Sequence, residues 1–275
     1  MKVITSGYNK HFIALSALFI LGNGVIVSPP KNADEYNFLG FIIACFVAII
    51  IYCVCFFVPV NRFTRVPICL LAFYCIWDAV ISFIKFISDN LLPHTNRFLI
   101  VLPMILIILY IVWQRKEILL KFSFMSFFIV LTVIIFFFFA TIKDFNIKNI
   151  FIYQLPTVRS IVGQMIPYIK MLILPIVLLS FFMKMNNIKR SASVVGVFIG
   201  FICFGLCILN SVLLFGIGLS GILDYPYSSA GSTVTFGTLF TRLDGFLYYF
   251  YLACCIVKCG VGIFTIKKLK ERSFP

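Results

Sequence analysis

Long apolar runs, uncharged over most of their length, dominate this sequence and limit what it can fold into. A helix needs ~20 predominantly apolar residues to cross the hydrocarbon core of a bilayer. Eight runs of about that length follow one another, at 12–28, 37–59, 66–86, 98–114, 122–142, 160–183, 193–218 and 243–266. We therefore expect an all-α polytopic membrane protein, in which residues 1–275 form a single transmembrane domain.

The composition excludes the main alternatives. The chain is 62% apolar and 12% charged, whereas a soluble domain is about 45–50% apolar and about 25% charged. Barrel strands alternate apolar and polar residues in segments of ~10, so the continuous runs also exclude a porin-like barrel. All ten cysteines lie inside apolar runs and both histidines stand near span ends. We therefore expect no disulfide, no metal site and no cofactor, and take the cysteines as small packing residues.

The net charge of +14 comes mainly from basic residues between the runs. In membrane proteins such residues accumulate in cytoplasmic loops, and no basic patch interleaved with aromatic residues indicates a nucleic-acid partner. With the N-terminus inside, the inner segments hold 14 Lys and Arg and the outer segments hold 7, which predicts that both termini are cytoplasmic. The outer segment 216–241, rich in Gly, Ser and Thr, could dip into the membrane where protein or water satisfies its backbone.

Two of the expected spans contain residues that interrupt helices. Glycines at 22 and 24 and a Ser-Pro-Pro at 28–30 lie in or after the first span, and Gly and Pro at 163–167 lie in the sixth. Such residues free backbone groups that need a partner in lipid. Interrupted helices at matching places in two halves mark the binding site of inverted-repeat transporters. The alternative is that Gly and Pro are simply common in transmembrane helices.

Five short motifs occur in order along the chain. They are Leu21-Gly22-Asn23-Gly24 with Ser28-Pro29-Pro30, Leu92-Pro93-His94-Thr95, Asp144-Phe145-Asn146-Ile147-Lys148-Asn149, Phe215-Gly216 with Tyr225-Pro226, and Phe240-Thr241-Arg242-Leu243-Asp244. Together they resemble the spore-germination permease family, the B subunits of germinant receptors and a branch of the amino acid–polyamine–organocation transporters. The resemblance implies a leucine-transporter-type inverted repeat of five plus five spans, with helices one and six broken and the substrate site between spans one, three, six and eight. This chain lacks the last two spans of that pattern, as a divergent short paralogue or a truncated product would.

The expected site combines the two interruptions with ionisable residues inside the spans. Asp78 lies in the middle of the third span, and an ionisable group at that depth is a functional candidate. We expect it to pair with Lys170 or Lys258, either as a structural ion pair or to couple a substrate amine or a proton. The expected substrate-binding residues are Gly22, Asn23, Gly24, Asp78, Gly163, Gln164 and Tyr168, and the family motif adds Tyr225, Pro226, Arg242 and Asp244.

In this hypothesis a substrate carboxylate sits on backbone amides at 22–24, at the N-terminus of a half-helix. Its ammonium group meets carbonyls of the sixth span, Tyr168 or Asp78. The resemblance implies the membrane subunit of a spore germinant receptor, which binds and could transport a small amino-acid-like germinant. Its partners would be that germinant, the receptor A and C subunits and the lipid bilayer, in the cell membrane or spore inner membrane of a sporulating bacterium.

Two other functions stay open. The chain could be a structural or assembly membrane subunit without its own ligand, or a relative of general amino-acid permeases. We do not expect an enzyme, because one embedded acid and two peripheral histidines do not form a catalytic cluster.

Overall fold

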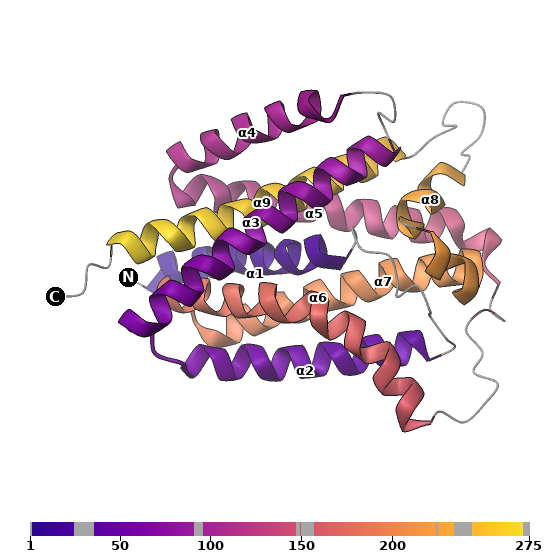
Figure 1. The fold of residues 1–275 in the computed structure, drawn as a ribbon, viewed down its shortest axis with the longest axis horizontal. Coiled ribbons are helices and arrows are strands. Elements are labelled where there is room, and N and C mark those ends of the chain that lie inside the picture. The colour runs from indigo at the N-terminus through magenta and orange to yellow at the C-terminus, as the bar shows by residue number, and fades with distance from the viewer. Residues whose placement is uncertain are drawn as a thin grey trace.

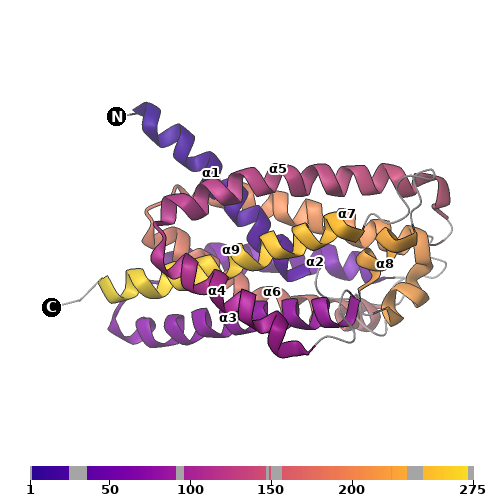
Figure 2. The ribbon, with the colours of Figure 1, turned by 90° about the horizontal axis from the view of Figure 1, so that it is seen from above.

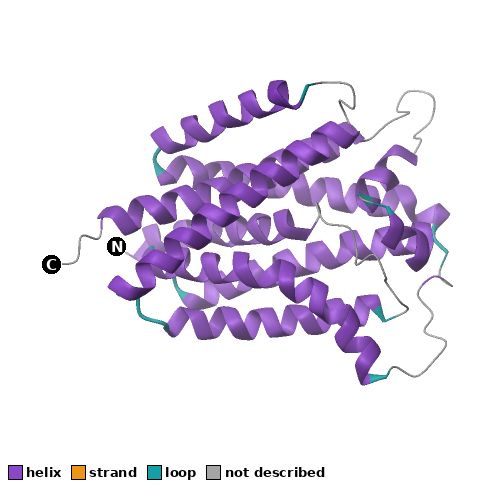
Figure 3. Cartoon of the chain, in the orientation of Figure 1, coloured by secondary structure: helices purple, strands orange, loops and turns teal. Residues whose placement is uncertain are grey.

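The computed structural model describes residues 2–24, 36–90, 96–146, 149, 157–223, 225–233 and 244–271. Within these ranges the regular structure is helical throughout (Figure 3). The long helices are α1 (Lys2–Gly24), α2 (Asn37–Phe57), α3 (Arg62–Asn90), α4 (Arg97–Trp113), α5 (Lys116–Thr141), α6 (Val158–Met185), α7 (Arg190–Ile222) and α9 (Asp244–Glu271). A 3-10 turn, η1 (Ile142–Asp144), follows α5, and a short helix, α8 (Pro226–Thr233), precedes α9.

Six of the described helices, α2, α3, α5, α6, α7 and α9, are long and apolar enough to cross a membrane. The helix α4 is also apolar, but its 17 residues make it shorter than these six. These helices indicate a multi-pass membrane protein and confirm the expected all-helical class for the described residues. The count of eight crossings stays a prediction.

The second half of α1 occupies the interior of the bundle, while its first turns project from it (Figure 2). Its residues 14–23 are all buried, and it packs against α5, α6, α7 and α9. A helix that is apolar on every face is expected to be buried, and this stretch is apolar except for Ser16 and Asn23. Most of the long helices lie roughly along one direction, but α1 and α4 are inclined to them in Figure 2. Both chain ends lie at the same end of the bundle (Figures 1 and 2).

Two glycines spaced four residues apart bring α7 close to α1. A Cβ on Gly196 would meet the Ile13 carbonyl oxygen at 2.6 Å, and one on Gly200 would meet Ile20 Cβ at 2.8 Å. Small residues at this spacing let two membrane helices approach to backbone contact, where van der Waals packing and not the hydrophobic effect holds them together. This contact fixes the central helix against α7.

The sixth span is bent but not broken, which corrects the expected interruption at 163–167. The helix α6 runs from Val158 to Met185 with Pro167 and Pro175 inside it, and Figure 1 shows its first part inclined to the rest. A proline removes one ladder hydrogen bond and kinks a helix, but neighbouring helices can satisfy the freed carbonyl and the helix continues.

In α7, by contrast, Gly216 has non-helical angles, φ 74° and ψ 167°.

The segment expected as one outer loop, 216–241, is partly helical. Its first residues belong to α7, and α8 packs against α7 and α9. Tyr227 and Ala230 of α8 are 4% and 0% exposed, so protein surrounds this short helix. Whether α8 lies within the membrane stays a prediction, and residues 234–243 lie outside the described ranges.

Candidate functional site

A partly buried ion pair links α3 and α9. The Lys258 ammonium of α9 is 3.2 Å from Oδ2 of Asp78 in α3. The Lys258 side chain is 3% exposed and that of Asp78 is 42% exposed. This is the one ion pair between side chains that the structure describes. Of the two partners expected for Asp78, the structure therefore places Lys258 there, while Lys170 lies on an exposed face of α6.

The last turn of α1 packs directly against this lysine. A Cβ on Gly22 would meet Cδ of Lys258 at 3.2 Å and Cβ of Cys254 at 2.9 Å, so only glycine allows this approach. Cys254 and Lys258 are well inside α9, which begins at Asp244 and ends at Glu271. The assigned end of α1 is therefore level with the interior of α9, and Figure 1 shows it stopping inside the bundle.

Gly22, Asn23 and Gly24 form the last assigned turn of α1. Residues 25–35 lie outside the described ranges, so the expected discontinuity after this turn stays a prediction. Within a helix the amides at 22–24 point back to the preceding turn, and a helix C-terminus presents carbonyls that attract cations. This end of the described helix therefore favours an ammonium group, and the expected contact of a carboxylate with amides at 22–24 stays a prediction.

Asn23 adds an acceptor at the same end of α1. Its side chain is buried, and Nδ2 donates to the Phe19 carbonyl at 3.1 Å. Its Oδ1 is buried and has no hydrogen-bond partner among the residues that the structure describes. A buried acceptor without a hydrogen bond costs about 1–3 kcal/mol, so a ligand that donates a hydrogen bond to it would be stabilised.

Gln164 and Tyr168 belong to a second polar cluster, between α6 and α2. The Tyr168 hydroxyl donates to Asn37 Oδ1 at 2.9 Å in a buried contact. A Cβ on Gly40 would meet Cβ of Gln164 at 2.8 Å, so α2 and α6 touch at this point. Gly163 lies apart from both clusters, because a Cβ there would meet nothing within 4 Å.

The expected site is thus divided in two. Gly22 and Asp78 come together through Lys258, whereas Gln164 and Tyr168 face α2. Sequence reasoning missed Asn37, the partner of Tyr168. Its position at the start of an apolar run is typical of a residue in the membrane interface, and nothing in the sequence links it to the sixth span.

The kink in α7 joins two of the sequence motifs. The carbonyl of Leu213, in the turn before Gly216, accepts hydrogen bonds from the Asn146 amide and from Asn149 Nδ2, each at 3.1 Å. The asparagines come from the stretch 144–149, and Gly216 from the Phe-Gly pair. The asparagines therefore satisfy the hydrogen-bonding capacity of the Leu213 carbonyl, and this carbonyl needs no ligand as a donor.

The other motif residues lie in or near α8 and α9. The ring of Tyr225 lies edge-on to that of Phe86, with 5.2 Å between centroids. Pro226 is the first residue of α8, where a proline costs no hydrogen bond. Asp244 is the first residue of α9. Arg242 lies outside the described ranges.

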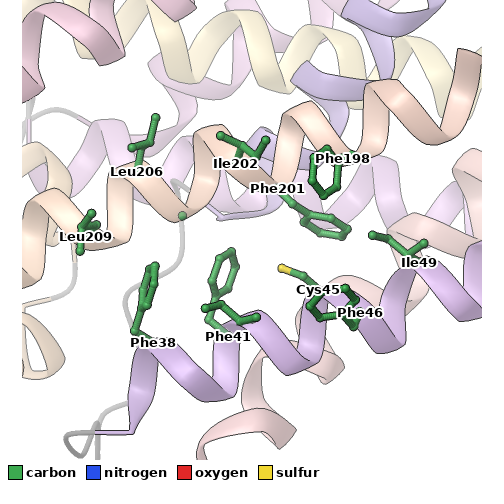
Figure 4. A pocket seen from close by; sticks show the side chains of 12 residues that line it. Phe38, Phe41, Cys45, Phe46, Ile49, Phe198, Phe201, Ile202, Leu206 and Leu209 are labelled. Atoms are coloured by element: carbon green, nitrogen blue, oxygen red, sulfur yellow. The ribbon is translucent and has the colours of Figure 1, made fainter. Parts of the chain in front are cut away.

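A groove between α2 and α7 has a volume of about 350 Å³. Figure 4 shows apolar side chains along both walls, among them Phe38, Phe41 and Phe201. Phe46 and Phe198 at its edge are 62% and 51% exposed, so it opens at the outer surface of the bundle. It offers no charge or strong hydrogen-bonding group to an amino-acid-like solute, and we do not place the site there.

Comparison with known proteins gave no match to a protein-family model, to a curated protein or to a solved structure. Among the described residues, no three His, Cys, Asp or Glu side chains gather where they could hold a metal ion. The fold and site therefore define a helical multi-pass membrane protein with an ion pair inside its bundle.

Proposed function

We propose that this protein is a membrane subunit that binds a small amino-acid-like solute. Following the resemblance of its motifs, we further propose that it serves in a spore germinant receptor, beside A and C subunits. The observation that carries the binding proposal is the Lys258–Asp78 ion pair at the end of α1.

The position of the pair supports this proposal. It is formed by α3 and α9 against the end of α1, and α6 packs on all three of these helices. In chain order these are the first, third, sixth and eighth long helices. They are the four that the resemblance implies for the substrate site.

The chemistry of the pair fits a zwitterion. An ionisable group inside a membrane costs several kcal/mol unless it is paired. An amino acid carries one carboxylate and one ammonium group, so its carboxylate can pair with Lys258 while its ammonium pairs with Asp78 or Asn23 Oδ1. When the ammonium pairs with Asp78, every charge keeps a partner and binding does not leave an ion alone.

The proposal includes eight crossings in an inverted-repeat arrangement, with α1 and α4 added to the six longer apolar helices. An even number agrees with the two chain ends at one end of the bundle (Figure 2). We place that end in the cytoplasm, because the excess of Lys and Arg lies there. The membrane would be the cell membrane or spore inner membrane of a sporulating bacterium.

A binding assay on the purified full-length protein tests this function. We would measure scintillation-proximity binding of a panel of radiolabelled L-amino acids to wild type and to a double variant, Asp78→Leu with Lys258→Met. The double variant removes both charges and so avoids an unpaired one. Lys170→Met, at an exposed position of α6, is the control.

We expect at least one amino acid to bind wild type and the control and to lose binding in the double variant. Equal binding by the double variant would show that the ion pair is not the site.

The structural or assembly subunit is the second candidate. The close packing of Gly22 on Cys254 and Lys258 favours it, because the space beside the lysine is filled in this conformation. If no amino acid of the panel binds wild type, this candidate takes first place.

A further inference from the structure

A polar cavity of about 330 Å³ lies at the end of the bundle that carries the chain ends. It is formed where α4 ends, α5 begins, α6 ends and the last turns of α9 pass. Four cationic and two acidic side chains line it: Arg115, Lys116, Lys267, Lys268, Glu117 and Glu271. Both glutamates are exposed and so are free to turn toward water.

Two lysines from different helices converge on one neutral oxygen in this cavity. Asn186 Nδ2 donates to the Phe182 carbonyl at 2.8 Å, which fixes the amide with Oδ1 on the other side. That Oδ1 accepts from Lys268 at 3.0 Å and from Lys116 at 3.5 Å. Two ammonium groups sharing one acceptor repel each other, and an anion placed between them would lower that repulsion.

The start of α5 adds positive potential to the same cavity. The helix begins at Lys116, and its N-cap residue, Arg115, gives no side-chain cap. The first amides of a helix carry the positive end of its dipole and form a natural site for a phosphate. The cavity thus combines a helix N-terminus with converging lysines.

The aromatic residues around the cavity indicate its depth. Trp113, the last residue of α4, is 92% exposed, and Phe264 lines the cavity. Exposed tryptophan is enriched where membrane helices meet the headgroup layer. Basic pockets between helices at this level suit anionic headgroups.

We propose that this cavity binds the phosphate of an anionic phospholipid headgroup. The proposal does not depend on the solute that the ion pair binds, because the cavity lies at the end of the bundle and the pair lies inside it.

Native mass spectrometry of the full-length protein in detergent tests the proposal, with phosphatidylglycerol and phosphatidylcholine as probes. The test variant is Lys116→Gln with Lys268→Gln, which keeps donors for Asn186 and removes two charges. The matched control is Lys121→Gln with Lys189→Gln, two exposed lysines that do not line the cavity. Inorganic phosphate is titrated separately, with the melting temperature as readout.

We expect phosphatidylglycerol to bind wild type more tightly than phosphatidylcholine. The test variant should bind it about 30-fold more weakly, which corresponds to about 1 kcal/mol for each lysine, and the control should bind as wild type does. If the test variant does not fold, Arg115→Gln replaces it, with an expected loss of about 5-fold.

Three results would overturn the proposal. Equal affinity for the two lipids would remove the anion requirement, and an equal loss in the control would show general charge attraction. A melting-temperature rise with inorganic phosphate, without a preference for phosphatidylglycerol, would assign the cavity to a soluble phosphate.

Discussion

Removing the carboxylate of Asp78 should destabilise the protein more than removing its partner. In Asp78→Asn the Lys258 side chain stays 3% exposed, and its ammonium loses the negative charge of the carboxylate that lies 3.2 Å away. Breaking a buried pair in this way costs about 3–5 kcal/mol. The Asp78 side chain is 42% exposed, so solvent screening reduces the interaction and we expect the lower limit, about 3 kcal/mol.

That loss corresponds to a fall in melting temperature of about 6–12 °C, at about 2–4 °C for each kcal/mol in a chain of this size. In Lys258→Met the remaining carboxylate can reach solvent, so we expect a smaller fall. The double variant, Asp78→Leu with Lys258→Met, leaves no unpaired charge and should melt within a few degrees of wild type, since such replacements are often neutral.

The cysteines provide the assay. Cys75, Cys254 and Cys255 are free and buried near the pair, so a dye that fluoresces on reaction with thiols reports their exposure on heating. We expect the double variant to have the highest melting temperature of the three variants, Lys258→Met an intermediate one and Asp78→Asn the lowest. An unchanged melting temperature for Asp78→Asn would refute the reasoning, because it would mean that the lysine is not held as a buried charge.

Three further substitutions and one fusion test other parts of the structure. Gly200→Leu should lower the melting temperature by overpacking against α1, where a Cβ would already meet Ile20 Cβ at 2.8 Å, at a cost of about 1–3 kcal/mol or more. Gly216→Ala, at φ 74° and ψ 167°, a region that only glycine adopts readily, should cost about 1–3 kcal/mol in denaturant unfolding. Tyr168→Phe should cost about 1–3 kcal/mol in the same assay, because Asn37 Oδ1 loses its buried donor. Alkaline phosphatase fused to the C-terminus should be inactive, and an active fusion would contradict the cytoplasmic assignment.

The helical architecture could be predicted because bilayer thickness sets the length of an apolar run. The long described helices fall on the expected runs, but several extend beyond them, and α8 lies where a loop was expected. The helix α1 begins at Lys2 and not near residue 12, because a helix can continue with polar residues outside an apolar stretch. Hydropathy marks the part of a helix that suits lipid, and it does not mark where the helix begins.

The partner of Asp78 could be predicted only in part. An acid inside a span needs a compensating charge, which limited the choice to Lys170 and Lys258. Choosing between them requires knowing which helix packs on α3, and that depends on contacts between distant segments. The separation of the ion pair from the Tyr168–Asn37 cluster could not be predicted for the same reason. The motifs show which residues occur along the chain, and they do not show which helices pack against each other.

The interruptions show what glycine and proline can and cannot predict. Both kinds of residue occur in α6, which continues as a bent helix, whereas the residue with non-helical angles is Gly216 in α7. A helix that is interrupted needs donors for the carbonyls that lose their partners. In α7 the donors come from Asn146 and Asn149. These residues are distant from Gly216 in the sequence, so the sequence around Gly216 does not reveal them.

These two irregular places differ in what they leave for a ligand. At α7 the Leu213 carbonyl already has donors from two asparagines, so a ligand would gain little there. At the end of α1, Asn23 Oδ1 is buried with no partner among the described residues, and the Lys258–Asp78 pair lies against the same turn. An added ammonium group would meet an acceptor that is otherwise unpaired, and an added carboxylate would meet a lysine already buried. Of the two places, the end of α1 is therefore where a charged solute gains the most free energy, and it is there that we expect binding.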